Sequence, residues 1–74
     1  GRSMKSNFEI KYHLFDLRKQ KNLTERELSA LSGVSKSQIN NIETGSANPT
    51  LRTICALSLA LNVQPCDLFS IEFL

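Results

Sequence analysis

The sequence is poor in the residues that build catalytic and metal sites, because its 74 residues include one histidine and two cysteines. Cys55 and Cys66 belong to no CxxC pair or Cys/His cluster and have apolar neighbours, so we expect small buried side chains without a redox or metal role. His13 lies within helical reach of Glu9 and Asp16, where it could join a surface carboxylate pair. Since no nucleophile, base and orienting group are assembled, the sequence predicts neither an enzyme nor a cofactor.

Long apolar runs and a strong net charge are also missing. No run approaches the roughly 20 residues that span a bilayer and no signal-peptide pattern is present, so we expect a cytoplasmic protein without a membrane partner. Residues 1–3 look like a remnant of recombinant expression, and without Arg2 the formal net charge falls from +2 to +1, which is weak evidence for a polyanionic partner. One domain of this length buries only about 60% of its unfolded surface, so self-association would be a natural source of further buried area.

What the sequence does contain is the periodicity of helices. Over residues 8–21, Ile10, Leu14 and Leu17 share one face while charged residues occupy the others. This spacing predicts a first helix with one buried stripe. Asn22 follows, and its tolerance of the left-handed conformation suits a helix end.

Two capping boxes mark the starts of the next two helices. In the first, Thr24 and Glu27 can each satisfy the other's free backbone N–H, and Gly33 is the expected stop. In the second, Ser35 precedes Gln38 by three residues. The side chains expected to face the core are Leu28 and Leu31 in the second helix and Ile39 and Ile42 in the third.

The fourth predicted helix is the most apolar. Pro49 disfavours helical geometry at the residue before it, and Thr50 then caps a helix over residues 51–61 that Asn62 can close. Pro65 suits the first turn of a short fifth helix, because its missing N–H would be unpaired there. The wide apolar face of the fourth helix consists of Leu51, Ile54, Leu57, Ala60 and Leu61.

The second and third helices have the spacing of a helix-turn-helix unit. Ser29 is small where the next helix would cross, Gly33 permits a positive φ in the turn, and Val34 can fill the gap between the helices. Ile39 and Ile42 can then lock the third helix onto the second. Because several such constraints occur at one consistent spacing, the sequence strongly indicates a helix-turn-helix unit.

The chain resembles a known family through these residues. "LTERELSALSGVSKSQINNIETG", "NPTLRTICALSLALNV" and "CDLF" resemble the lambda-repressor-like, Cro/XRE-type helix-turn-helix transcription regulators of bacteria and phages. The resemblance covers about residues 10–69 and implies an all-α, five-helix DNA-binding domain over residues 4–69. It further implies a partly buried ion pair between Arg18 and Glu43, which without the family would be two solvated surface charges.

The resemblance also assigns roles on the third helix, whose N-terminal end enters the major groove in family complexes. It implies base contacts by Lys36, Ser37, Asn40 and Asn41, and these side chains can donate to guanine, pair with adenine or bond either way. Gln38 is less suited, because its capping role competes with recognition. The alternative for each residue is a polar face that is merely solvated.

Phosphate contacts are expected around the two helix starts and the loop that follows the third helix. The candidates are Thr24, Ser35, Thr44, Ser46, Asn48 and Arg52. Two features depart from the family: Glu25 stands where members often carry a phosphate-binding Gln, and Ser46 and Ala47 replace common basic residues. We therefore expect a shallow salt dependence, set by roughly 2 to 4 phosphate contacts per subunit.

The C-terminal tail, residues 70–74, continues an alternation that begins at Phe69 and has the period of a strand. A single strand has no partner in an all-helical monomer. The tail is therefore either a packed extension over the core or a strand or apolar patch that pairs with its copy in a dimer. The residues expected at a dimer interface are Val63, Leu68, Phe69, Ile71, Phe73 and Leu74.

These observations predict a sequence-specific double-stranded DNA-binding transcription regulator. We expect a repressor that binds an inverted repeat as a homodimer and places two recognition helices, residues 35–44, in successive major grooves. The alternative is a DNA-binding antitoxin or a protein-interaction module with the same fold and a protein partner.

Overall fold

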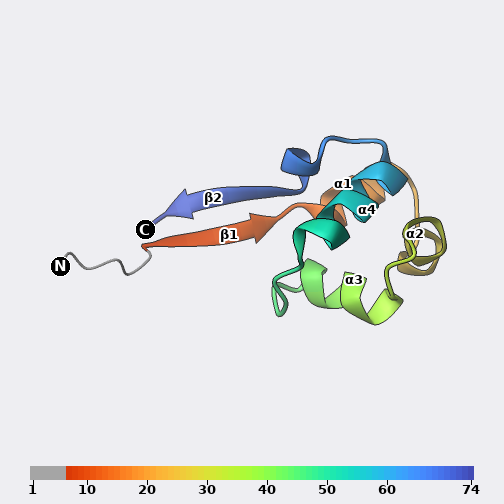
Figure 1. Cartoon of the computed structure of the whole chain (residues 1–74), viewed down its shortest axis with the longest axis horizontal. Helices are drawn as coiled ribbons and strands as arrows, with labels where there is room; N and C mark the ends of the chain where they lie inside the picture. The colour runs from red at the N-terminus through yellow and green to blue at the C-terminus, as the bar shows by residue number, and fades with distance from the viewer. Residues whose placement is uncertain (1–6) are drawn as a thin grey trace.

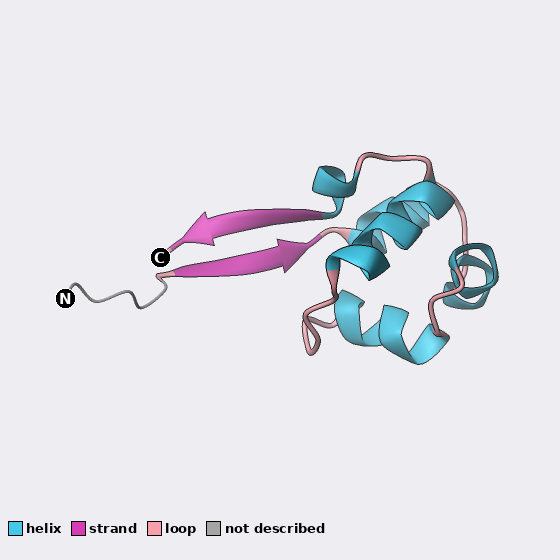
Figure 2. Cartoon of the chain, viewed as in Figure 1, coloured by secondary structure: helices cyan, strands magenta, loops and turns pink. Residues whose placement is uncertain are grey.

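The computed structural model describes residues 7–74, so the suggested expression remnant at residues 1–3 lies outside the described residues. Four α-helices form a compact body, and a two-stranded sheet projects from it as a ribbon (Figures 1 and 2). The elements follow in the order β1 (Phe8–Tyr12), α1 (Leu14–Gln20), α2 (Glu25–Ser32), α3 (Lys36–Glu43), α4 (Leu51–Leu61), the 3-10 turn η1 (Pro65–Leu68) and β2 (Phe69–Phe73). No helix in the described part of the chain is long and apolar enough to span a bilayer.

The core lies between the helices and receives apolar side chains from every helix and from η1. These side chains belong to Leu14, Leu28, Val34, Ile39, Ile42, Ile54, Leu57, Leu61 and Leu68. Burial of a side chain of this size contributes about 1.5 to 3 kcal/mol relative to exposure, so this cluster is the main source of the body's stability.

The helix ends follow the predicted capping chemistry. Thr24 accepts a hydrogen bond from the Glu27 N–H, and the Glu27 carboxylate accepts one from the Thr24 N–H, which completes the first capping box. The Ser35 hydroxyl accepts a hydrogen bond from the Gln38 N–H, which forms one half of the second predicted capping box. Thr50 caps α4 in the same manner.

The connections between helices use the left-handed conformation where the sequence predicted it. Asn22 and Asn62 have φ of 58° and 59°, and Gly33 has φ of 77° at the end of α2. A side chain at Gly33 would be strained by this backbone conformation even though open space surrounds it.

The prediction of a first helix over residues 8–21 is wrong for residues 8–13, because residues 8–12 form strand β1 and α1 begins only at Leu14. Ile10 is 43% exposed and belongs to no helical stripe. His13 also differs from the prediction, since its N–H bonds the Leu68 carbonyl and its ring Nε2 contacts the Ser70 hydroxyl at 3.0 Å. It therefore joins the start of α1 to β2 and contacts neither Glu9 nor Asp16.

The C-terminal strand is present, but its partner is β1 of the same chain. The two strands pair antiparallel with Phe8 opposite Phe73, Ile10 opposite Ile71 and Tyr12 opposite Phe69. The all-α class and the single unpartnered strand are both corrected by this pairing. The predicted fifth helix is likewise only the four-residue turn η1, so residues 7–74 form four α-helices and not five.

Several apolar side chains that were expected in the core lie at the surface. Leu31 is 62% exposed and Leu51 is 77% exposed, and Cys55 and Cys66 are both exposed. The other described elements cover only one side of α4, so Ile54, Leu57 and Leu61 reach the core while Leu51 and Cys55 do not. Leu68, in contrast, was expected at a dimer interface, but it is 1% exposed and therefore cannot contribute to a dimer surface.

Candidate nucleic-acid interface

Helix α3 lies along one edge of the helical body (Figure 1), and the polar side chains on one of its sides are exposed. Ile39 and Ile42 are almost completely buried, which fixes the rotation of the helix about its axis. Val34, 7% exposed, fills the turn that joins α2 to α3. The four side chains assigned to base contacts, Lys36, Ser37, Asn40 and Asn41, are all exposed.

An ion pair fixes α3 against α1. Arg18 donates to both carboxylate oxygens of Glu43, with Nε–Oε2 and Nη2–Oε1 distances of 2.6 and 3.0 Å, and also donates to the Leu23 carbonyl at 2.9 Å. The two side chains are only 9% and 5% exposed. The hydrogen bond to Glu43 raises the pKa of Arg18 above its ordinary value, against an opposing effect of burial. The bidentate pair expected from the resemblance is therefore present.

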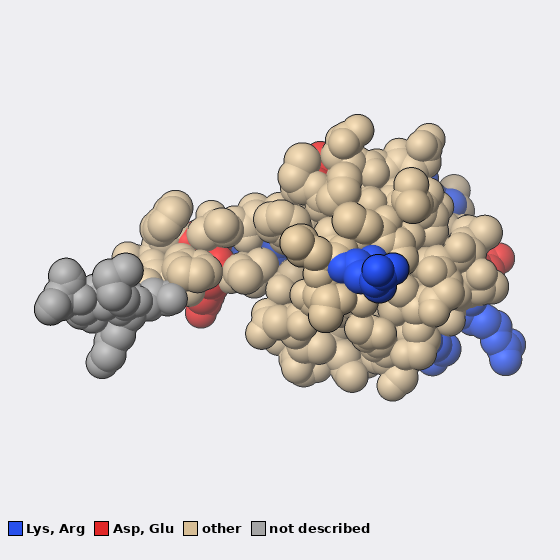
Figure 3. Space-filling model, in the orientation of Figure 1, with Lys and Arg blue, Asp and Glu red and all other residues tan. Residues whose placement is uncertain are grey.

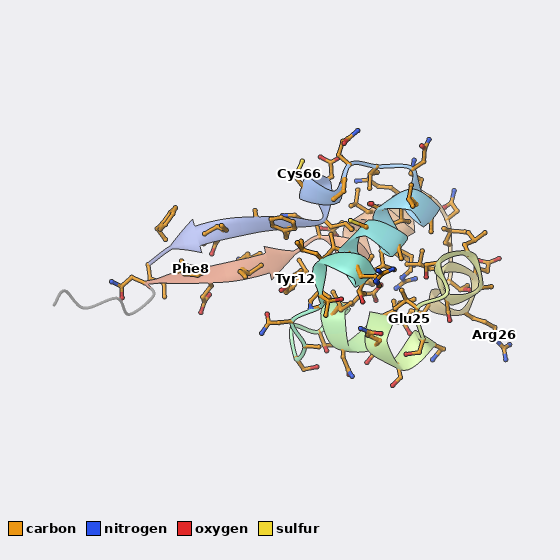
Figure 4. All side chains as sticks on the ribbon, viewed as in Figure 1. Phe8, Tyr12, Glu25, Arg26 and Cys66 are labelled. Atoms are coloured by element: carbon orange, nitrogen blue, oxygen red, sulfur yellow. The ribbon has the colours of Figure 1, made fainter. Side chains whose placement is uncertain are left out.

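Glu25 connects α2 to the polar face of α3, an arrangement that the sequence did not predict. The Asn40 side-chain amide donates to Glu25 Oε2 at 3.1 Å, and Lys36 Nζ lies 3.7 Å from Glu25 Oε1. Figure 4 shows Glu25 between α2 and α3. The hydrogen bond from Asn40 lowers the pKa of Glu25, and the charges of Lys36 and Arg18 lower it further. Glu25 is therefore an anion that orients two of the four candidate base-contacting side chains.

The fixed amide of Asn40 has a chemical consequence. A carboxylate only accepts hydrogen bonds, so Glu25 holds the Asn40 NH2 group, and not its oxygen, toward α2. The Asn40 Oδ1 and the second N–H remain available, and adenine recognition requires one acceptor and one donor of this kind. The contact between residues 25 and 40 joins two helices, and no local spacing in the sequence could reveal it.

The hydroxyls expected to bind phosphate are largely engaged within the protein. Thr24 and Ser35 use theirs as helix caps, while Thr44 and Ser46 contact each other at 3.1 Å and both donate to the Asn41 carbonyl. The Asn48 side-chain oxygen accepts a hydrogen bond from Tyr12 at 2.9 Å. Arg52 is exposed on α4.

A hollow at the start of α2 gathers basic side chains, two of which, Lys19 and Arg26, were not predicted to contact DNA. It is lined by Arg18, Lys19, Asn22, Leu23, Thr24, Glu25, Arg26 and Lys36. Lys19 and Arg26 are exposed, and Figure 4 shows Arg26 extending away from the body. Lys19, Arg26 and Lys36 come from three different helices, so their proximity could not be predicted from any one segment.

An exposed helix that is presented by a tight turn and braced by an ion pair defines a helix-turn-helix DNA-binding domain. The family model for helix-turn-helix domains, HTH_3, matches residues 14–68. The chain belongs to this family of Cro/XRE-type transcription regulators. The match begins at α1 and ends with η1, so it covers the helical body.

Similar proteins include other regulators. The uncharacterized HTH-type transcriptional regulator y4dJ of Sinorhizobium fredii is 40% identical over 52 residues, which are 70% of this chain and 68% of that protein. Among solved structures, the restriction-modification controller protein C.AhdI from Aeromonas hydrophila is 34% identical, with a TM-score of 0.72 over 74% of this chain and 83% of that one.

Two further structures extend the comparison. An HTH_3 family transcriptional regulator from Vibrio cholerae is 32% identical, with a TM-score of 0.69 over 72% of this chain but only 30% of that one. The transcriptional regulator VanUg has a TM-score of 0.76 over 100% of this chain and 99% of its own. Its identity is 20%, so this last similarity concerns the fold alone.

Proposed function

We propose that this transcription regulator is a repressor that reads an inverted-repeat operator through α3, as a homodimer on double-stranded DNA. The observation that carries the proposal is the division of α3 into two faces. Ile39 and Ile42 are buried while the polar side chains between them remain exposed. A helix held in this manner can enter the major groove with its side chains already oriented.

Four side chains on α3 are the proposed base contacts. Asn41 is exposed and its side chain can pair with adenine, while Asn40 is oriented for the same base by Glu25. Lys36 can donate to guanine, and Ser37 can donate or accept. Because the four residues carry only one charge among them, they are better suited to choosing a sequence than to holding phosphate.

Phosphate binding is proposed for the groups around the hollow and the loop. Lys19 and Arg26 join the earlier candidates because they are exposed beside the N-terminus of α2. Backbone N–H groups at the starts of α2 and α3, and Arg52 on α4, complete the set. Glu25 and Glu27 lie in the first turn of α2 and oppose an anion there, which supports a shallow salt dependence.

Repression would follow from occupancy of a promoter. A two-fold dimer places its recognition helices about 34 Å apart, which matches half-sites one helical turn apart. The bound dimer would then exclude polymerase from overlapping DNA. No second domain is needed for this mechanism.

Selection of bound duplexes from a random pool tests the DNA-reading proposal. We expect an enriched inverted repeat whose half-sites are about one helical turn apart. Asn41→Ala should then lose discrimination at one base pair of each half-site, while the control Gln20→Ala, an exposed amide on α1, should leave the selected sequence unchanged. Failure to bind any duplex at about 50 mM salt would overturn the proposal and favour the protein-interaction alternative.

A further inference from the structure

Helix α4 carries a stripe of apolar side chains that none of residues 7–74 covers. Leu51, Cys55 and Leu59 are spaced four residues apart, so they lie along one side of the helix. Leu51 is 77% and Leu59 is 82% exposed, and Cys55 is exposed as well. This stripe is separate from the side of α4 that reaches the core.

The ribbon carries a second exposed apolar surface. Directly paired residues in an antiparallel sheet lie on the same face, and this face alternates with the other along each strand. One face therefore carries only apolar and aromatic residues, whereas the other carries Glu9, Lys11, Ser70 and Glu72. The members of the apolar face are Phe8, Ile10, Tyr12, Phe69, Ile71 and Phe73.

The two surfaces meet at Leu51. One hollow joins Leu51 to Cys55 and Leu59 on α4. A second hollow joins Leu51 to Ile10 and Phe69 at the base of the ribbon. In Figure 3 the side of the molecule bearing α4 and the ribbon is mostly uncharged, apart from a basic side chain near the middle of the body and acidic atoms on the ribbon. We name this continuous surface, from Leu59 through Leu51 to Phe73, the α4–ribbon face.

We propose that the α4–ribbon face is the contact surface of a homodimer, with the same face of a second copy as its partner. This inference gives a surface to the homodimer in the proposed function. It replaces the interface predicted from the fifth helix and the tail, because the structure buries Leu68 in the core, packs Val63 against that core and adds β1 and α4 to the exposed part of the tail.

The exposed area supports a stable interface. The exposed fractions of Phe8, Ile10, Leu51, Leu59, Ile71 and Phe73 are 38, 43, 77, 82, 51 and 83%. Multiplied by the full accessible area of large apolar side chains, these fractions correspond to roughly 650 Å² of exposed apolar surface per chain. This area is above that of the largest apolar patch on a typical monomeric protein. Two copies would then bury about 1,300 Å², within the range of specific protein interfaces.

The chemistry of the surface favours a second copy as its occupant. An apolar surface is complementary to itself, and a two-fold contact places the same patch on both sides. Arg52 borders the stripe, and its long side chain can keep its charge at the rim. A dimer contact would stabilise the ribbon in particular, because an isolated two-stranded sheet is only marginally stable in water.

The orientation of α3 is compatible with this dimer. Figure 1 shows α3 at one edge of the body, away from the ribbon and below α4. A partner on the α4–ribbon face therefore leaves the exposed side chains of α3 uncovered. Two recognition helices could then face the same DNA duplex.

Sedimentation of the full chain without DNA tests the surface directly. The wild type should be dimeric at micromolar concentration, and Leu59→Glu and Ile71→Glu should each raise the dimer dissociation constant at least about tenfold. Leu31→Glu is the matched control, because Leu31 is 62% exposed on α2, outside the surface. All three substituted residues are exposed, and unchanged circular dichroism would show that each variant is folded.

The two cysteines provide a second measurement that needs no substitution. The alkylation rate of the Cys55 thiol should fall as protein concentration rises through the dissociation constant. The rate for Cys66, which projects from η1 in Figure 4, should not change. A wild type that is monomeric at tens of micromolar, or a dimer unaffected by Leu59→Glu, would overturn the inference. Neither result depends on DNA, so DNA binding in the selection experiment would still support the recognition role of α3.

Discussion

The side of the molecule that carries α3 and the α4–ribbon face are built in opposite ways. Around α3, Arg18 pairs with Glu43, and Glu25 contacts both Lys36 and Asn40, so the charged groups there have partners. The α4–ribbon face consists of large apolar side chains that remain exposed in the described part of the chain. A satisfied polar network fixes side chains in place, whereas an uncovered apolar surface gains free energy by finding a partner. The first arrangement suits reading of DNA, and the second suits assembly.

The largest expected effect is the loss of the buried ion pair. Arg18→Ala leaves Glu43 charged and 5% exposed, so we expect the free energy of unfolding to fall by about 3 to 5 kcal/mol. Denaturant unfolding measures this change. The double variant Arg18→Met with Glu43→Leu is the control, because removing both charges should restore most of the stability. A loss below about 1 kcal/mol would show that the pair behaves like an exposed one.

The helical body was predictable because its signals are local. Capping residues, left-handed turns and the buried side chains of α2 and α3 lie within a few residues of one another, and Thr24, Gly33 and Ile39 all behave as the sequence indicates. The ion pair between Arg18 and Glu43 is not local, and only the resemblance to the family indicated it.

The ribbon was missed because its pairing joins the two ends of the described chain. Ile10 lies four residues before Leu14, which is the spacing of a helix, so this spacing favours a helix over Phe8 to Tyr12 although these residues also alternate. The strand signal at Phe69 was recognised, but its partner could not be found by periodicity. The orienting contact of Glu25 with Asn40 escaped prediction for the same reason.

The second prediction concerns sequence discrimination by α3. Asn41→Ala removes a donor and an acceptor from an exposed amide, and we expect the preference for the correct base pair to fall by about 1 to 3 kcal/mol per half-site. Competition binding with operators changed at single positions measures it. The salt dependence should stay the same, because the amide carries no charge. An equal loss of affinity for all duplexes would instead place Asn41 in a structural role.

The third prediction tests whether Glu25 restrains Lys36. Glu25→Gln removes the charge that holds Lys36 Nζ at 3.7 Å, so Lys36 becomes available to phosphate. Affinity for unrelated duplexes should rise, and the slope of log affinity against log salt should steepen by about 0.9 for each Lys36 that contacts a phosphate. Glu27→Gln is the control, since Glu27 contacts the Thr24 N–H and no residue of α3. An unchanged slope would contradict the restraint.

The fourth prediction follows from the lowered pKa of Glu25. Because its pKa is lower in the folded state than in the unfolded state, the charged form contributes stability above the unfolded value of about 4.3. That contribution is lost as the pH falls through the lower folded pKa. The stability difference between the wild type and Glu25→Gln should therefore be constant from pH 6 to 8 and shrink below about pH 4. If the stability difference instead grew as the pH fell, the pKa of Glu25 would be raised in the folded state and not lowered.

The smallest expected effect is the loss of the ion pair on the ribbon, because this exposed pair contributes little to the free energy of unfolding. Lys11 Nζ and Glu72 Oε2 are 3.3 Å apart, but the side chains are 55% and 50% exposed. Lys11→Met should therefore change the free energy of unfolding by less than about 1 kcal/mol. It should also leave the sedimentation of the dimer unchanged, because Lys11 lies on the ribbon face opposite Ile10 and Ile71. If Lys11→Met dissociated the dimer as strongly as Ile71→Glu, the charged face of the ribbon and not its apolar face would be the one that contacts the partner.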